Sequence, residues 1–495
     1  MDYVLGIDIG TGSTKVVAVN LASEPIAAAQ HHYPTYSPRP GFSEQDPELI
    51  WQAVRRGIKD IVAKLHDSPL AACFSSAMHS LIPVDENGFR LTDMITWADS
   101  RSDAIASRLK TSPQATHIYE SSGMPLHAMS PLCKIIWLKE NMPEVFKQTY
   151  KFISIKEYIW FKLFDEYVVD HSIASASGML DISSRAWSPE LIALAGITVG
   201  QLSQPVSTLY SSARKHSLYD ILDKETSFVI GASDGCLANL GSFATRMGIA
   251  AVTIGTSGAV RIASDKPIFN KQAMTFSYCL DENLFICGGP VNNGGNVLQW
   301  LLTNFLSKPV NEENIEWVFN LATQVSPGAD GLIFLPYING ERAPIWDAKS
   351  SGAFIGIRSV HTQAHFCRAA LEGVCYALND VLLAIETGSE HIVQINVSGG
   401  FVNSPMWMRL LADITGKRLA LMQTEDASAV GAAFMAIKFL GSNGAKYPEK
   451  PESDRPLFIE PDPKKRKLYD ASFLIFKGLY SGLKESMHQL NLINL

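Results

Sequence analysis

The chain has 495 residues, 46% of them hydrophobic and 18% charged, and its formal net charge is −7. This length exceeds what one hydrophobic core usually supports, so we expect two domains of ordinary globular composition. The negative charge disfavours broad nucleic-acid binding, which needs a basic face. We expect neither a signal peptide nor a membrane span, because no apolar stretch reaches the ~18 residues that a span requires.

Seven cysteines are scattered along the chain, and none forms a CxxC pair. Their spacing matches no zinc-binding pattern. We interpret them as small buried hydrophobic residues in a reducing compartment, which predicts a cytoplasmic protein.

Strand-like apolar runs alternate with amphipathic helical patterns along the chain, which predicts a mixed α/β fold. In chain order, we expect helices over residues 48–65 and 129–140, a strand over 228–232, a strand over 331–336, a helix over 365–386, a strand over 394–397 and a helix over 405–415. A surface connection over about 441–466 leads to a final amphipathic helix, roughly 467–489, which should pack on the second domain.

A short motif occurs twice, about half the chain apart. Ile9-Gly10-Thr11-Gly12 reappears as Ile254-Gly255-Thr256-Ser257-Gly258, each time between two strand-like runs. Three residues alone can recur by chance, but the matching strand context favours two similarly built halves that face one ligand. We place the boundary near residues 242–248, which gives domains 1–244 and 245–495.

The first of these turns is rich in glycine and hydroxyl side chains. It is neither a P-loop nor a dinucleotide motif, because the glycine spacing is wrong and the chain returns as a strand. Consecutive amides in such a turn can form an anion nest, and Asp8 just before it can hold a divalent cation. A plain hairpin with a solvated acid is the alternative. The second turn favours a site, since two opposed nests can clamp the polyphosphate of ATP.

Two further elements follow strand-like runs. Asp234 lies at the carboxyl end of a strand, where α/β sheets bind ligands. It can cap the next helix, but opposite two phosphate nests it is favoured as the base that accepts a hydroxyl proton. The pair Gly399-Gly400, before Asn403, can let a flat ring approach the backbone closely. The alternative is that it forms only a tight turn between a strand and a helix.

With these elements in this order, the chain resembles the FGGY family of carbohydrate kinases, of the actin/hexokinase/Hsp70 superfamily, over essentially its whole length. Both family signatures are present in full. The first is MSPLCKIIWLKEN, from Met129 to Asn141, and the second runs from Gly352 (GAFIGI) to Glu372 (HFCRAALE). The resemblance implies an α/β fold of two ribonuclease-H-like domains around an interdomain active-site cleft, with ATP and Mg²⁺ as cofactors.

The resemblance also assigns roles to single residues of this sequence. Asp234 matches the general base, and Asp8 and Asp234 are the acids near the metal. The nucleotide-binding positions are Gly10, Thr11, Thr14, Lys15, Gly255, Thr256, Ser257, Gly399, Gly400 and Asn403. The substrate-binding positions are Met78, His79, Trp97, Asp99, Arg101, His127 and Asp234. Buried histidines, a core tryptophan and a surface ion pair are the structural alternatives for the substrate positions.

Small differences in these motifs between members of the family indicate the substrate. Xylulokinases are similar but have Gln before Met-His and Asn-Asp after Trp, where this chain has Ala77 and Ala98. Its Ala-Met-His-Ser, Thr-Trp-Ala-Asp-x-Arg and His-Ala-Met-Ser-Pro segments are closer to FGGY gluconokinases, although their His-Pro-Met is His-Ala-Met here. Cations that could bind a gluconate carboxylate are Arg101, His127, Lys156 and Arg342.

We therefore expect ATP-dependent phosphorylation of D-gluconate to 6-phosphogluconate. The alternatives are a xylulokinase that makes xylulose 5-phosphate, another FGGY polyol or ketose kinase, and, more remotely, a non-catalytic nucleotide-dependent binding protein. The expected partner is a small-molecule sugar or sugar acid, with no nucleic acid and no membrane. A homodimer stays open.

Overall fold

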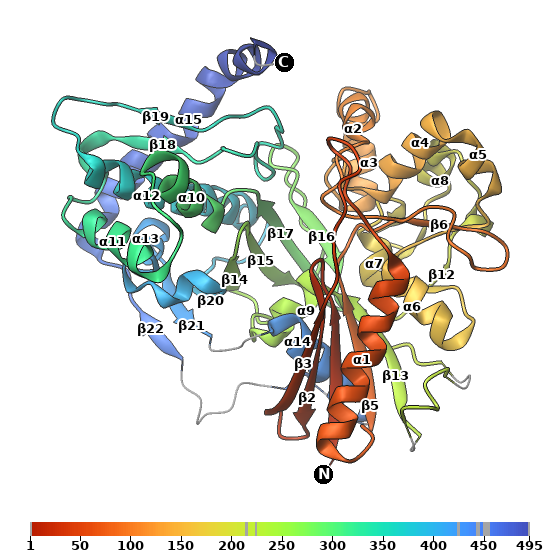
Figure 1. Cartoon of the computed structure of the whole chain (residues 1–495). Helices are drawn as coiled ribbons and strands as arrows, with labels where there is room; N and C mark the ends of the chain where they lie inside the picture. The colour runs from red at the N-terminus through yellow and green to blue at the C-terminus, as the bar shows by residue number, and fades with distance from the viewer. Residues whose placement is uncertain are drawn as a thin grey trace.

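The computed structural model describes residues 2–212, 216–222, 225–422, 426–441, 446–448 and 456–493. Two lobes of sheet and helix stand side by side in Figure 1, the first drawn mainly in red to yellow and the second mainly in green to blue. In the part of the chain that is described, no helix has the length and apolar character needed to cross a membrane. All seven cysteines are free and buried, which confirms their interpretation as core residues.

The first lobe is built on a five-stranded sheet of order β13-β5-β1-β2-β3. Its strands β1, β2 and β3 are antiparallel, whereas β5 and β13 run parallel to β1. Helix α1 (Pro47–Leu65) covers one face, with Asp46 capping its N-terminus and proline at its first position. The strands are β1 (Tyr3–Ile9), β2 (Ser13–Asn20), β3 (Pro25–His32), β5 (Ala71–Ser76) and β13 (Ser227–Ser233).

The second lobe repeats this plan in a seven-stranded sheet of order β16-β17-β15-β14-β20-β21-β22. Again a hairpin, β14–β15, continues into an antiparallel strand on one side and parallel strands on the other. The strands are β14 (Ile249–Ile254), β15 (Gly258–Ser264), β16 (Phe276–Cys279), β17 (Phe285–Val291), β20 (Gln394–Ser398), β21 (Arg418–Leu421) and β22 (Leu457–Ile459). The repeated glycine turn therefore occupies the equivalent hairpin of each lobe.

Smaller elements are inserted into both lobes. Those of the first lobe are β4 (Glu44–Gln45), β6 (Ile82–Val84), β7 (Met94–Ile95), α2 (Asp103–Lys110), α3 (Ala115–Ser122), α4 (Pro131–Asn141), α5 (Pro143–Gln148), β8 (Lys151–Ile153), α6 (Ile155–Phe164), β9 (Val168–Asp170), α7 (His171–Ser175), β10 (Leu180–Asp181), β11 (Ala186–Trp187), α8 (Pro189–Ala195), β12 (Gln204–Val206) and α9 (Asp234–Gly241). The second lobe has α10 (Gly295–Trp300), α11 (Glu312–Thr323), β18 (Ile333–Leu335), β19 (Ala353–Ile355), α12 (Gln363–Glu386), α13 (Pro405–Thr415) and α15 (Pro463–Ile493). The remaining helix, α14 (Ala427–Leu440), lies between α13 and α15 in the chain.

The elements expected from periodicity are present as α1, α4, β13, β18, α12, β20 and α13. The connection expected over 441–466 differs, and part of it lies outside the described residues. It contributes the edge strand β22, and α15 begins earlier than expected because Pro463 can start a helix, while the Asp462 side chain accepts a hydrogen bond from the Lys464 amide (3.0 Å). As expected, α15 packs on the second lobe, against α12, α13 and β18.

Helix α14 crosses from the second half of the chain to the first lobe. It packs against β1, β5 and α9, and Figure 1 shows it in blue beside the red strands. Glycines permit this contact: a Cβ on Gly6 would lie 1.7 Å from the Ala429 carbonyl oxygen, and one on Gly431 would lie 2.0 Å from that of Leu237. Residues 427–440 therefore pack with the first lobe, although they fall within the second predicted domain.

Candidate active site

Two cavities adjoin at the glycine turn of the second lobe. The larger, about 1090 Å³, is lined only by residues that follow β13 in the chain. The smaller, about 340 Å³, lies between the lobes and receives residues from both. Gly255 and Thr256 line both cavities. We call the larger the second-lobe pocket and the smaller the interlobe pocket.

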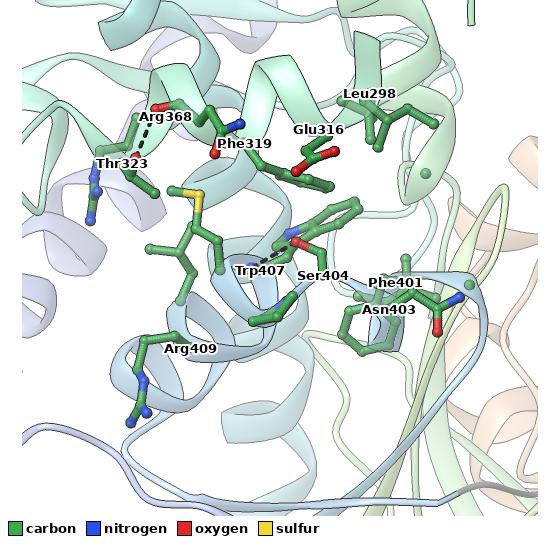
Figure 2. Close-up of a pocket in the computed structure, with 18 of the residues that line it drawn as sticks. Leu298, Glu316, Phe319, Thr323, Arg368, Phe401, Asn403, Ser404, Trp407 and Arg409 are labelled. Carbon is green, nitrogen blue, oxygen red and sulfur yellow. Dashed lines mark hydrogen bonds between the residues drawn. The ribbon is translucent and has the colours of Figure 1, made fainter. Parts of the chain in front are cut away.

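The second-lobe pocket has an aromatic wall, and polar and charged side chains line much of the rest. Figure 2 shows Phe319 of α11 facing Trp407 of α13, and their ring centroids are 6.1 Å apart. Glu316 and Asn403 add polar atoms to the lining. An aromatic wall suits a flat base, and the polar groups around it suit the hydroxyls of a nucleoside.

The glycine pair expected at the adenosine divides into two roles. Gly400 lines the second-lobe pocket, and a Cβ there would meet no atom within 4 Å. Gly399 lies behind it with φ of 101°, and a Cβ there would lie 2.4 Å from the carbonyl oxygen of Ile254. Gly399 therefore allows β20 to turn against β14, while Gly400 leaves room for a ligand.

The second glycine turn is braced by the start of α10. The Gly255 amide donates to the Ser257 carbonyl oxygen (2.9 Å), and the Gly295 amide donates to that of Gly255 (2.7 Å). Gly294 and Gly295 permit this approach, since a Cβ on Gly295 would lie 2.7 Å from the Gly255 oxygen. A Cβ on Gly255 would meet no atom within 4 Å, so its backbone faces open space.

The first glycine turn closes the β1–β2 hairpin. The Gly10 amide donates to the Ser13 carbonyl oxygen (3.1 Å), and the Tyr33 hydroxyl donates to that of Gly10 (2.6 Å). Thr11 lines the interlobe pocket, whereas Thr14 is buried behind the turn. Lys15 forms an ion pair with Asp426, the residue before α14.

Two buried carboxylates, Asp8 near the end of β1 and Asp234 just after β13, lie close enough for their charges to interact. Asp234 begins α9 directly after β13 and lines the interlobe pocket. Burial raises its pKa, and the nearby Arg261 guanidinium opposes this shift. Burial and the charge of Asp234 raise the pKa of Asp8 to about 7, although the Ser75 hydroxyl donates a hydrogen bond to Asp8 (2.6 Å). A raised pKa suits a carboxylate that must accept a proton near neutral pH.

The same two acids fit a magnesium ion. Mg²⁺ is usually held by one or two carboxylates together with substrate phosphates and water, and it would offset the repulsion between Asp8 and Asp234. The described residues contain no group of three or more histidine, cysteine, aspartate or glutamate side chains suited to a metal. An ion here would therefore depend on a phosphate ligand.

The interlobe pocket has an apolar wall that carries polar groups. Met78, Trp97 and Met129 line it from the first lobe, and Phe276 and Tyr278 from the second. The indole nitrogen of Trp97 donates to the Thr11 hydroxyl (2.8 Å), which holds the ring against the first glycine turn. His79 also lines the pocket; burial lowers its pKa to about 3, so the ring is neutral, and Nδ1 bonds to the Ala176 carbonyl oxygen (2.8 Å).

Asp99 and Arg101, expected at the substrate, do not line the pocket. They form a buried ion pair (2.7 Å), and Arg101 also pairs with Glu44 (2.6 Å). The Arg101 guanidinium lies 3.8 Å from the centroid of the Phe42 ring. Opposite charges in contact let both side chains enter the protein interior. A role of Asp99 and Arg101 at the substrate stays a prediction.

Of the other three cations predicted to bind a gluconate carboxylate, one lines the interlobe pocket and two do not. Burial lowers the pKa of His127 to about 3, and its ring packs on Trp346 (5.4 Å between centroids), outside the lining of the pocket. Lys156 pairs with Asp170 (2.9 Å) and donates to the Ala232 carbonyl oxygen (2.7 Å), so it supports the strand that carries Asp234. Arg342 lines the interlobe pocket.

Sequence reasoning missed Arg261 of β15, which also lines the interlobe pocket. The signal was available, because this arginine interrupts an apolar strand directly after the second glycine turn. Tyr278 of β16 and the Gly294-Gly295 pair were missed as well, and neither stands next to a recognised motif.

Two adjoining pockets, a shared glycine turn and a buried carboxylate define a two-lobed phosphotransferase site. Models of the FGGY family of carbohydrate kinases match residues 3–241 with the N-terminal domain and residues 250–438 with the C-terminal domain. The chain belongs to the FGGY family and is an ATP-dependent carbohydrate kinase with the two-domain fold of that family.

Individual relatives agree with this membership. The chain is 42% identical to a gluconokinase of Bacillus licheniformis over 450 residues, which covers 89% of this chain and 88% of the relative. A xylulose kinase of Staphylococcus epidermidis is 28% identical over 98% of this chain and 97% of its own length. Among solved structures, a gluconate kinase from Lactobacillus acidophilus has a TM-score of 0.93 at 33% identity and covers 99% of both chains. A xylulose kinase from the same species has a TM-score of 0.93 at 32% identity, covering 99% of this chain and 100% of its own.

Proposed function

We propose that this enzyme transfers the terminal phosphoryl group of ATP to the terminal hydroxyl group of D-gluconate, which gives 6-phosphogluconate and ADP. The observation that carries the proposal is that Gly255 and Thr256 line both pockets. A nucleotide in the second-lobe pocket can pass its phosphates along this turn toward an acceptor beside Asp234.

Asp234 acts as the general base in this proposal. It accepts the proton of the acceptor hydroxyl while the hydroxyl oxygen bonds to the γ-phosphorus and the bond from phosphorus to the β–γ bridging oxygen breaks. The two glycine turns supply amide donors to the phosphates. Asp8 and Asp234 would hold Mg²⁺, which neutralises charge on the phosphate oxygens when it is bound. Enclosure between the lobes keeps water from competing with the acceptor.

Gluconate is favoured over xylulose by identity to the relatives. The gluconokinase of Bacillus licheniformis is 42% identical, against 28% for the xylulose kinase of Staphylococcus epidermidis. Similarity to solved structures does not separate the two, since both Lactobacillus acidophilus enzymes have a TM-score of 0.93. D-Xylulose is therefore the second candidate acceptor. A cytoplasmic location, where ATP is available, agrees with the free buried cysteines.

The test is a coupled assay of ADP release with ATP, Mg²⁺ and a panel of acceptors: gluconate, xylulose, ribulose, glycerol and erythritol. We expect the highest kcat/KM with gluconate and loss of the rate without Mg²⁺. A gluconate rate no higher than the acceptor-free background would reject the proposal. A higher kcat/KM with xylulose would favour the second candidate.

A further inference from the structure

The interlobe pocket carries more positive than negative charge. Among its lining residues, Asp234 is the acid, and Arg261 and Arg342 are the bases, while the neighbouring His79 is neutral at physiological pH because burial lowers its pKa to about 3. Two guanidinium groups against one carboxylate favour an anionic ligand. Outside the lining, the charge of the adjacent Glu341 acts on Arg342, but the Glu341 carboxylate is itself held by hydrogen bonds from Asn293 and from backbone amides.

The two arginines lie at different positions relative to Asp234. Arg261 is beside it: the Arg261 Nε lies 3.3 Å from where a Cβ of Gly235, the next residue, would be. Arg342 instead lies over Trp97, with its guanidinium carbon 5.3 Å from the ring centroid, and its charge acts on His79. Arg261 is thus placed at Asp234, which we call the reacting end, and Arg342 is placed at Trp97 and His79, although the two guanidinium charges still act on each other.

Arg342 has donors to spare for a ligand. Its Nε donates to the Asn292 side-chain oxygen (2.7 Å) and its Nη2 to the Val291 carbonyl oxygen (3.2 Å). Within the described residues these partners are neutral, and a guanidinium carries five N–H donors in a planar fork that matches a carboxylate. Burial lowers the pKa of Arg342 to about 10, which leaves it charged at neutral pH.

The segment that carries Arg342 is fixed from several sides. Glu341 and Asp347 exchange backbone hydrogen bonds of 2.8 and 2.9 Å, which close the turn around Arg342. The Asp347 carboxylate accepts hydrogen bonds from Tyr480 and His488 of α15 (both 2.6 Å). Lys110 of the first lobe donates to the Trp346 carbonyl oxygen (3.1 Å). This support holds the guanidinium in place before a ligand arrives.

We propose that Arg342, beside Trp97 and His79 in the interlobe pocket, binds the carboxylate of the acceptor and thereby selects sugar acids over neutral sugars and polyols. This inference rests on the proposed kinase function and deepens it. A linear sugar acid has its carboxylate at one end and its terminal hydroxyl at the other, so one ligand can place its hydroxyl at Asp234 and its carboxylate at Arg342. Arg261, beside Asp234, serves the reacting end.

The test compares D-gluconate with D-glucitol, which carries a neutral CH₂OH group in place of the carboxylate. Arg342→Gln should lower kcat/KM for gluconate by about 30- to 100-fold, the effect of losing a charge-assisted hydrogen bond, and should change that for glucitol by less than about threefold. Arg342→Lys should recover part of the loss because it keeps the charge. Arg418→Gln, at an exposed ion pair with Glu460, is the matched control and should behave as the wild type.

The arginine beside Asp234 provides an internal contrast. Arg261→Gln should slow both acceptors alike, since it changes the reacting end. Equal losses for gluconate and glucitol in Arg342→Gln, or no loss for either, would overturn the inference. The inference would also be overturned if Arg261→Gln lowered kcat/KM for gluconate alone and Arg342→Gln lowered it for neither acceptor.

Further measurements separate this inference from the proposed function. If Arg342→Gln does not fold, acceptor binding to the wild type is measured instead, by calorimetry in the presence of ADP. Rising salt concentration should weaken the binding of gluconate and leave the binding of glucitol unchanged. Activity with another sugar acid but not gluconate would reject gluconate as the substrate and retain the role of Arg342, tested with that acid. Activity with neutral acceptors alone would reject both.

Discussion

The two pockets of this kinase are built in contrasting ways. The second-lobe pocket takes all of its lining from residues 254–465, whereas the interlobe pocket needs Thr11, Trp97 and Asp234 from the first lobe and Arg342 from the second. A nucleotide site formed within one lobe does not depend on how the lobes are placed. An acceptor site shared by two lobes does, so chemistry can be coupled to their approach. Changes in one pocket should therefore be separable from changes in the other.

The largest effect is expected for Asp234→Asn, which removes the base from the interlobe pocket. Turnover should fall by about 10²–10⁴-fold, the usual contribution of a general base. Because Asp234 is absent from the lining of the second-lobe pocket, ATP affinity measured by calorimetry without Mg²⁺, which Asp234 would help to hold, should stay within about twofold of the wild type. Equal loss of turnover and ATP binding would contradict the separation of the pockets.

A matched glycine pair tests the second-lobe pocket alone. Gly400→Val places a side chain in open space at the ligand, so KM for ATP should rise about tenfold, equivalent to 1.4 kcal/mol, while KM for gluconate stays unchanged. Gly399 has a φ of 101°, and a side chain there would clash with the Ile254 backbone. Gly399→Val should therefore lower the free energy of unfolding by about 3 kcal/mol instead. Chemical denaturation and initial rates distinguish the two. Similar phenotypes for both variants would refute the division of roles.

A smaller effect should follow from Asp8→Asn in the first lobe. Burial and the charge of Asp234 raise the pKa of Asp8 to about 7, so the folded state holds a proton that the unfolded chain releases at a lower pH. Stability of the Mg²⁺-free protein should thus fall as pH rises from about 4 to about 7. Above pH 7 the variant should be more stable than the wild type by roughly 2 kcal/mol, and this advantage should fade toward pH 4.

The measurement is denaturation with EDTA from pH 5 to 8, with the exposed Asp2→Asn as control. The same Asp8→Asn protein should lose kinase activity, because it lacks one of the two carboxylates proposed to hold Mg²⁺. A variant that is less stable than the wild type at pH 8 would contradict the account of Asp8.

Much of this architecture could be predicted from the sequence because it depends on local pattern. Apolar periodicity located α1, α12 and α13, and the repeated Ile-Gly-Thr turn anticipated the equivalent hairpins of the two lobes. The glycine pair after β20 and the carboxylate after β13 were visible for the same reason, since each follows a strand directly.

What could not be predicted depends on contacts distant in sequence. The Asp99–Arg101 ion pair was foreseen only at the surface, and nothing local shows that Glu44 and Phe42 enclose it in the interior. Nor does any local pattern show that α14 crosses to the first lobe through Gly6 and Gly431. The aromatic wall formed by Phe319 and Trp407 joins two helices that are far apart in the chain. Such pairs are set by the tertiary fold, which residue patterns within one segment do not encode.

The most direct test of the central claim is a crystal structure with gluconate and a non-hydrolysable ATP analogue bound together. The account predicts the adenine between Phe319 and Gly400, the terminal phosphate at Gly255 and Thr256, and the terminal hydroxyl of gluconate at Asp234. A nucleotide bound outside the second-lobe pocket, or an acceptor whose terminal hydroxyl points away from Asp234, would contradict it.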